Sequence, residues 1–355
     1  MTIKGIAGIL REIKYFKSVM REYGDSLVRG KYHIHPVFRA ISLYDPDIGK
    51  AAREYFDKYK PARGVRIASH CLNKIGFLHN KNKQSTEEYE AIYTANNYDV
   101  IREVKLFSFR RKKVLTVCTS NDEQEKQIHL FELLSGAYNM PRVKRGYKYP
   151  NCLEISMITM KDGDELNALR SIADCTAKYN TAVNNYLRIS VKKLVELSLD
   201  CEDASHLEML IGKIDSSFYD LPIPLCLQHG DLSKDNLIYG ECDGKTDFWW
   251  IDWEHVGERI FFYDYFFYIV HSAMFYDMRA LQRFVKGESD EFLGALFAQF
   301  GLEYCKDKRF NYLLIFMVAF FKERLSTKAS YPLRDKYYRL VEDMELFVRG
   351  EKDEA

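Results

Sequence analysis

Residues 225–254 constrain the fold of this chain most, because they place short apolar runs between polar residues in a half that is otherwise mostly helical in pattern. One apolar run ends at His229-Gly230-Asp231, and Asn236 follows Asp231 by five residues. A second apolar run ends at Asp252, sixteen residues after Asn236. Such runs, bounded by turn residues, are typical of buried strands. The segment predicts a tight turn and a hairpin whose polar residues face one cleft.

These residue types in this order suit phosphoryl transfer from ATP. That reaction needs a carboxylate that orients the acceptor hydroxyl and takes its proton, and oxygen ligands that hold magnesium against the phosphates. A His-x-Asp-x-x-x-x-Asn loop followed by an Asp at a strand end supplies both. Taken singly, the His229-Gly230-Asp231 segment is an ordinary turn, Asn236 is a cap and Asp252 is a strand end. Their occurrence together in this order favours a site.

The segment resembles the kinase-like phosphotransferases of the aminoglycoside phosphotransferase and choline kinase superfamily, and the resemblance spans residues 86–340. It implies a bilobal, protein-kinase-like α+β fold with a small antiparallel-sheet N-lobe and a larger helical C-lobe. It also implies ATP and Mg²⁺ as cofactors and an alcohol group as phosphate acceptor. The residue roles that it implies are Asp231 as catalytic base, Asn236 and Asp252 as magnesium ligands, and His229 and Asp264 as structural support of the loop.

Two features separate the chain from protein kinases. Ser233 stands two residues after Asp231, where those enzymes usually carry lysine, and only eleven residues separate Asp252 from Asp264, with no Ala-Pro-Glu motif after them. Little room is left for a peptide-docking platform, so we expect a small-molecule or glycan acceptor. Residues 251–264 resemble phosphotransferases of bacterial surface-glycan pathways, such as lipopolysaccharide or capsule synthesis, which implies a sugar acceptor. A choline or aminoglycoside-like acceptor and a non-catalytic pseudokinase interaction module are the alternatives.

The preceding part of the chain is predicted to be the nucleotide-binding lobe. Its patterns predict strands over 87–94, 100–109, 114–118 and 153–158, with a helix over 123–134. By the resemblance, a strand lysine held by a helix glutamate should contact the ATP phosphates. Glu125 is our choice for the glutamate, with Glu123 and Glu132 as alternatives. The expected lysine position holds Thr116, with Lys113 and Lys105 nearby, and Ala95-Asn96-Asn97 replaces a glycine-rich loop, so the pseudokinase alternative stays open.

The chain is predicted to divide into a helical N-terminal extension (1–80), the N-lobe (81–160) and a helical C-lobe with the catalytic loop (161–355). Apolar residues of the first helix recur at helical spacing, and basic residues, Lys14 and Lys17 among them, fill much of the other face. The helix either packs on its domain or lies on the anionic cytoplasmic face of the inner membrane. Glu12 and Glu22 dilute its positive charge and favour packing.

Composition excludes several classes of protein. The chain has 52 Lys and Arg against 51 Asp and Glu, a net charge of +1, so we expect no nucleic-acid partner bound through bulk charge. Eight scattered cysteines without a Cys-x-x-Cys pair predict reduced thiols, and no signal peptide precedes them. The best apolar run, 312–321, is too short to cross a membrane and is expected to be a buried helix. A cytoplasmic protein is predicted, and its oligomeric state is left open.

Overall fold

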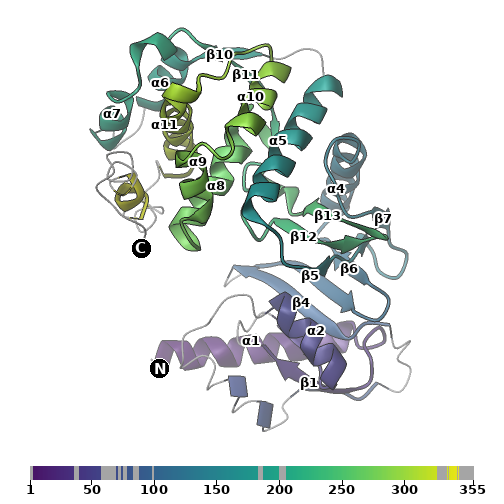
Figure 1. The fold of residues 1–355 in the computed structure, drawn as a ribbon. Helices are drawn as coiled ribbons and strands as arrows, with labels where there is room; N and C mark the ends of the chain where they lie inside the picture. The colour runs from purple at the N-terminus through teal and green to yellow at the C-terminus, as the bar shows by residue number, and fades with distance from the viewer. Residues whose placement is uncertain are drawn as a thin grey trace. The chain divides into compact units, whose positions relative to one another are not determined.

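The chain forms two compact units in a computed structural model (Figure 1). The first unit comprises Met1–Leu133, Pro141–Lys161 and Gly240–Asp247, and the second comprises Leu134–Met140, Asp162–Tyr239 and Phe248–Ala355. The structure describes residues 3–35, 40–56, 69–70, 73–74, 78–82, 88–97, 100–182, 187–199, 205–325, 334, 336–341 and 343.

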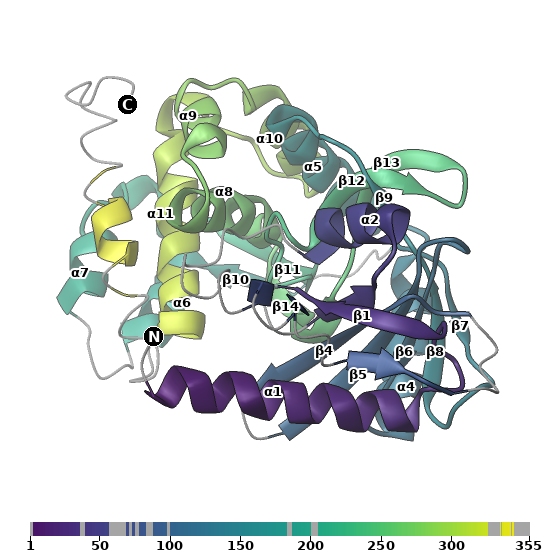
Figure 2. The ribbon, with the colours of Figure 1, turned by 90° about the horizontal axis from the view of Figure 1, so that it is seen from below.

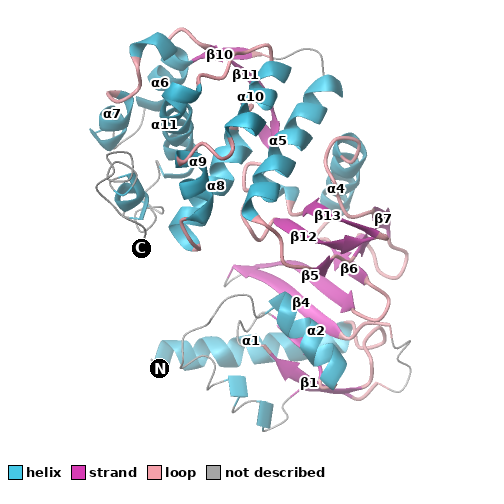
Figure 3. Cartoon of the chain, viewed as in Figure 1, coloured by secondary structure: helices cyan, strands magenta, loops and turns pink. Residues whose placement is uncertain are grey.

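The first unit is built on an eight-stranded antiparallel sheet with the strand order β3-β1-β2-β4-β5-β6-β8-β7 (Figure 3). The strands are β1 (Gly30–Ile34), β2 (Ala40–Leu43), β3 (Leu78–Asn80), β4 (Ala91–Asn97), β5 (Val100–Ser108), β6 (Lys113–Val117), β7 (Val143–Arg145) and β8 (Cys152–Ser156). The unit also contains α1 (Ile3–Glu22), α2 (Pro46–Phe56), most of α4 (Asn121–Leu134) and the short strand β9 (Thr159–Met160).

Helices cover both faces of this sheet. Alternate residues of each strand point to opposite sides, so neighbouring apolar residues pack against different helices. Ile92, Leu106 and Leu115 share one buried cluster with Phe16 and other apolar residues of α1. Their sequence neighbours Ala91, Phe107 and Val114 share another with Ala52 and Phe56 of α2. Figure 2 shows α1 running beside the strands. The described apolar side chains of α1 therefore face the protein core, as the packing interpretation of this helix expects.

The sheet is larger than the sequence predicted. Residues 1–80 were expected to be a helical extension, but β1, β2 and β3 extend the sheet beyond β4. The predicted turn at Ala95-Asn96-Asn97 is instead the end of β4, which stays paired with β5 through a β-bulge. Short strands such as β3 carry too few residues for an alternating pattern to be recognised. Glu87, the predicted first strand residue, lies outside the described residues.

Helices dominate the second unit, as predicted. They are α5 (Glu165–Ala182), α6 (Val191–Leu199), α7 (Ser205–Ile211), α8 (Tyr263–Phe275), α9 (Arg279–Val285), α10 (Asp290–Gln299) and α11 (Arg309–Phe320), with the 3-10 turns η1 (Ser216–Phe218), η2 (Trp253–His255) and η3 (Lys306–Lys308) and the π-helical turn η4 (Phe321–Leu325). A small sheet has the order β10-β11-β14, formed by β10 (Arg188–Ser190), β11 (Pro222–Gln228) and β14 (Gly257–Ile260). The pattern of residues 336–348 also predicts a helix, of which the structure describes only 336–341 and 343.

Buried aromatic rings form the core around α8 and α11. Phe262 and Phe297 stack at 5.7 Å between centroids, and Phe266 packs against Phe316. Helix α11 is almost entirely buried, which confirms that the apolar run 312–321 belongs to the core. Among the helices that the structure describes, none is long and apolar enough to span a bilayer. The α+β class predicted from the sequence, with a sheet-rich part and a helical part, is confirmed.

Candidate active site

The second unit carries the predicted catalytic loop at the end of β11. This strand pairs with β14 through to Gln228, and His229-Gly230-Asp231 follows directly. Gly230 has a φ of +80°, a left-handed conformation that side chains disfavour. A Cβ at this position would lie 2.5 Å from the guanidinium of Arg259 and 2.6 Å from the carbonyl oxygen of His255. Only glycine therefore fits the turn.

Asp264 fixes the backbone of this turn. Its carboxylate accepts hydrogen bonds from the amide of His229 at 2.6 Å and from that of Gly230 at 2.8 Å. In return, the side chain of Gln228 accepts the amide hydrogen of Asp264 at 3.1 Å. Asp264 is fully buried in the first turn of α8, and burial raises the pKa of its carboxyl to about 6. The resemblance assigned Asp264 to tying this helix to the loop, and the structure places it there.

His229 links the loop to the strand end that carries Asp252. Its Nε2 lies 2.8 Å from the carbonyl oxygen of Ile251, which can only accept, so Nε2 carries the proton. The other ring nitrogen, Nδ1, accepts the amide hydrogen of Asp231 at 3.3 Å. Burial of the ring lowers the pKa of His229 to about 4, so the imidazole is neutral at physiological pH. The neutral tautomer with its proton on Nε2 satisfies both hydrogen bonds.

Asn236 orients the carboxylate that is expected to act as the base. Its side-chain amide nitrogen donates to the backbone oxygen of Asp231 at 2.8 Å and approaches Asp231 Oδ2 at 3.4 Å. The backbone oxygen of Asn236 accepts the amide hydrogen of Ile251, the residue before Asp252. Because the amide nitrogen is engaged on the loop, the side-chain oxygen of Asn236 is the atom left to bind a cation.

Asp252 lies in a strained backbone conformation at the end of a hairpin. The hairpin is formed by β12 (Leu237–Cys242) and β13 (Lys245–Trp250), joined by Asp243-Gly244 in the left-handed conformations that a two-residue turn requires. Asp252 has a φ of +66° and an exposed side chain that caps no helix. Left-handed non-glycine residues gather at functional sites. Burial raises the pKa of Asp231, and the charge of Asp252 adds to that rise.

Arg324 is a site residue that the sequence did not reveal. It lies in η4, and its Nη2 donates to the carbonyl oxygen of Gly230 at 2.8 Å and approaches Asp231 Oδ1 at 3.4 Å. Burial raises the pKa of Asp231, and the charge of Arg324 opposes that rise. Glu323 beside it pairs with Arg259 of β14, which anchors η4 next to the loop. No sequence signal links positions 93 residues apart.

The tryptophans beside Asp252 belong to the core. Trp253 is buried and lies 4.7 Å from the His229 ring and 5.0 Å from the Tyr138 ring between ring centroids. Trp250 is fully buried and stacks on Trp253. These rings support His229 from behind and are not available to a ligand.

The residues predicted to contact ATP phosphates lie in the first unit, and the structure does not pair them as expected. Glu125 is exposed on α4 and forms an ion pair with Arg145, while Lys113 pairs with Glu154 at 2.8 Å. Lys105 of β5 lies opposite Thr116 of β6 in the sheet register. Lys105 is therefore on the same face as the position where the resemblance expects a lysine.

A second carboxylate accompanies Lys105. Glu103, two residues before it on β5, forms an ion pair with Lys105 at 3.1 Å. Residues two apart on a strand share one face, so Glu103 can pair with Lys105 without a glutamate from a helix. Glu103 was not among the predicted glutamates, because the resemblance implies a glutamate on a helix.

Two oxygen ligands from the chain would hold a magnesium ion at the loop. Among the described residues, no group of three His, Cys, Asp or Glu side chains is placed to hold a metal ion by itself. The side-chain oxygen of Asn236 and the carboxylate of Asp252 are ligands of the type that Mg²⁺ prefers, and Mg²⁺ commonly completes its shell with water and substrate phosphates. The donor set fits a nucleotide-bound magnesium ion.

Comparison with known proteins finds likeness in solved structures only. No protein-family model and no curated protein sequence matches the chain. The choline kinase LicA from Streptococcus pneumoniae shares 13% identity at a TM-score of 0.44, over 79% of this chain and 98% of its own. A choline/ethanolamine kinase family protein from Mesorhizobium loti shares 15% identity at a TM-score of 0.42, over 73% of this chain and 85% of its own. An aminoglycoside phosphotransferase-type protein from Ralstonia eutropha shares 13% identity at a TM-score of 0.43, over 70% of this chain and 88% of its own.

Proposed function

We propose that this chain is an ATP- and magnesium-dependent phosphotransferase that phosphorylates a hydroxyl of a non-protein acceptor. The observation that carries the proposal is the turn 229–231, whose backbone is held by Asp264 while Asn236 orients Asp231. Such a turn presents one carboxylate to a reacting hydroxyl and leaves two oxygen ligands beside it. Because ATP is the phosphate donor, we place the protein in the cytoplasm.

In the proposed reaction, Asp231 accepts the hydrogen bond of the acceptor hydroxyl and takes its proton as the phosphoryl group is transferred. Burial favours this role, because it raises the pKa of Asp231 and makes the carboxylate a stronger base. Asn236 and Asp252 would hold magnesium, which when bound offsets the negative charge of the phosphates. In the first unit, Lys105 is our choice for the lysine that contacts them, since it faces the same side as Thr116.

For the acceptor we propose a sugar, as in a bacterial surface glycan. Two acidic side chains near the catalytic loop are paired with one cation: Lys234 bridges Glu165 and Asp277, at 3.2 Å from the latter. Asp235, in the loop itself, accepts a hydrogen bond from Tyr276 at 2.5 Å, and the Tyr276 ring is partly exposed. Paired acids with an exposed aromatic ring suit stacking on a sugar better than binding a cationic acceptor such as choline.

The first experiment measures magnesium-dependent ATP binding and slow ATP hydrolysis. Asp231→Asn should still bind Mg-ATP while hydrolysis falls by about 10² to 10⁴, the usual contribution of a general base. Asp252→Asn should lose the magnesium-dependent part of binding, since asparagine tolerates the left-handed backbone but lacks the charge. Lys105→Met should weaken ATP binding, and Lys113→Met is its matched control. An acceptor screen then compares sugars with choline and aminoglycosides.

A non-catalytic nucleotide-binding module is the second candidate, favoured by one observation. Glu125 pairs with Arg145 and with neither predicted lysine. On this alternative, the wild-type protein binds ATP but hydrolyses it no faster than Asp231→Asn, with or without acceptors. If the wild type binds no nucleotide at millimolar concentration, both candidates fail and the chain is an interaction module.

A further inference from the structure

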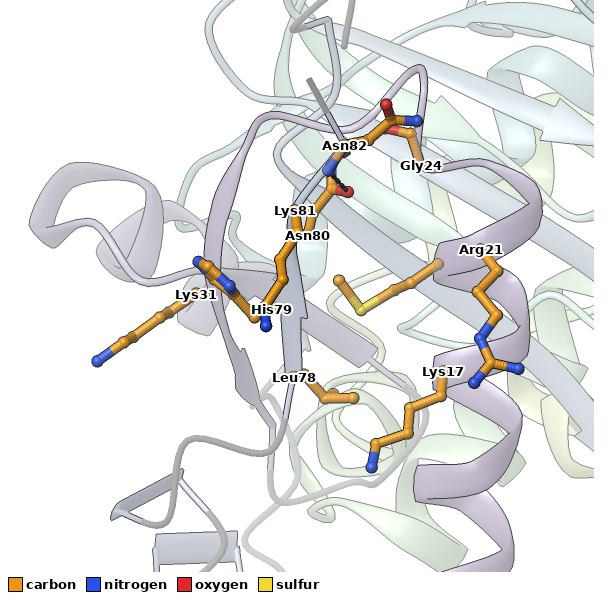
Figure 4. Close-up of a pocket in the computed structure, with 10 residues that line it drawn as sticks. Lys17, Arg21, Gly24, Lys31, Leu78, His79, Asn80, Lys81 and Asn82 are labelled. Atoms are coloured by element: carbon orange, nitrogen blue, oxygen red, sulfur yellow. Dashed lines mark hydrogen bonds between the residues drawn. The ribbon is translucent and has the colours of Figure 1, made fainter. Parts of the chain in front are cut away.

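A basic pocket lies in the first unit, away from the catalytic loop in the sequence (Figure 4). Its volume is about 730 Å³, within the range of small-molecule sites. Lys17 and Arg21 line it from α1, Lys31 from β1, and His79 and Lys81 from β3 and the residue that follows it. Among the residues that the structure describes, no acidic residue lines the pocket, although acidic and basic residues are nearly equal in number over the whole chain.

Three of these cations differ from other basic residues of the same unit in what they contact. Lys113, Arg145 and Lys148 each form an ion pair with a glutamate. Within the described part of the chain, by contrast, Arg21, Lys31 and Lys81 form no ion pair. A concave site in which these three cations lack a carboxylate partner favours an external anion.

The frame of the pocket is held by buried hydrogen bonds. Asn80 is buried and donates to the carbonyl oxygens of Gly24 at 3.0 Å and Leu27 at 2.8 Å, which joins β3 to the turn after α1. The side-chain oxygen of Asn80 also accepts the amide hydrogen of Asn82 at 3.2 Å. A Cβ on Gly24 would lie 2.6 Å from the carbonyl oxygen of Met20, so the wall is tightly packed there. The pocket therefore has a fixed backbone beneath flexible basic side chains.

Charge decides the class of ligand. The last turn of α1 contributes a partial negative charge of about −0.5 at its carbonyl end. Arg21, Lys31 and Lys81 together carry three positive charges, which exceed this contribution. Arginine and lysine bind phosphate oxygens by charge-assisted hydrogen bonds. We propose that this pocket binds a phosphate-bearing ligand, supplied either by a soluble metabolite or by a lipid headgroup.

The test titrates inorganic pyrophosphate into the full-length protein by calorimetry, in EDTA so that no metal holds the anion at the catalytic loop. Arg21→Glu and Lys81→Glu should each weaken binding at least about 10-fold at low ionic strength. Lys14→Glu makes the same charge change on the exposed side of α1 without lining the pocket, and should weaken binding less than about 2-fold. Circular dichroism melts check that all variants are folded.

Vesicles distinguish the two sources of phosphate. Co-sedimentation compares phosphatidylcholine vesicles with vesicles containing about 20% phosphatidylglycerol. If the ligand is a lipid headgroup, the wild type and Lys14→Glu sediment with the anionic vesicles and the two pocket variants do not. If the ligand is soluble, pyrophosphate binds and none of the proteins sediments. The proposal is overturned if the wild type binds neither probe, or if Lys14→Glu loses as much binding as the pocket variants.

Discussion

Replacing Asp264 by asparagine should remove a pH dependence of the protein's stability while impairing the site. The carboxyl of Asp264 is fully buried, and its pKa is raised from 3.8 to about 6 by that burial. A raised pKa means that the folded protein holds the proton more tightly than the unfolded chain. The stability contributed by the protonated form is complete below pH 4 and is lost as the pH rises through about 6.

The magnitude follows from the size of the displacement. Moving the pKa from 3.8 to about 6 corresponds to about 3 kcal/mol, at about 1.4 kcal/mol per pH unit. The free energy of unfolding of wild type minus that of Asp264→Asn should therefore fall by about 3 kcal/mol between pH 4 and pH 7. His229 titrates in the same range but is present in both proteins, so its contribution cancels in this difference.

Urea denaturation at several pH values between 4 and 7 measures this difference, with Asp220→Asn as a control at an exposed position. Turnover should fall about 10- to 100-fold in Asp264→Asn. The backbone N–H of His229 or of Gly230 would then face the side-chain NH₂ group of the asparagine and lose its acceptor oxygen. A stability difference that stays constant with pH would refute the reasoning, since Asp264 would then titrate alike in the folded and unfolded states.

Three further predictions follow from the same loop. Gly230→Ala should lower the free energy of unfolding by at least about 2 kcal/mol in the same denaturation assay, because left-handed strain adds to a clash with Arg259. Gly244 has the same φ of +80°, but no atom lies within 4 Å of its Cβ, so Gly244→Ala should lower the free energy of unfolding by only about 1 kcal/mol. His229→Gln should make the protein's stability less sensitive to acid. Burial lowers the pKa of His229 to about 4, so the stability that the neutral ring contributes is lost as the pH falls from about 6.5 to 4. Over that range the free energy of unfolding of wild type should fall by about 3 kcal/mol relative to that of the variant. Arg324→Met should raise the pKa of Asp231, so the acidic limb of the pH–turnover profile should move to higher pH. Lys322→Met is the control, and an Arg324→Met profile that is displaced no more than the control profile would contradict the contact between Arg324 and Asp231.

The sequence by itself determined the centre of the candidate site. Asp231, Asn236 and Asp252 lie within 22 residues, and short-range spacing fixes a turn and a hairpin whatever surrounds them. Asp264, a little further along, was also assigned correctly to the support of the loop. The strands β5 and β6 and the helix α4 were predicted close to their observed bounds, because their hydrophobic patterns are long enough to be periodic.

Only the tertiary structure decided the contacts between distant segments. Arg324 reaches Asp231 through a π-helical turn, and Lys105 lies opposite Thr116 because of the register of two strands. The strands β1 to β3 gain their place at a sheet edge from pairing, not from their own short sequences. Local propensity and periodicity act over a few residues, whereas packing joins residues that are remote in the chain, and such contacts leave no mark in a single sequence.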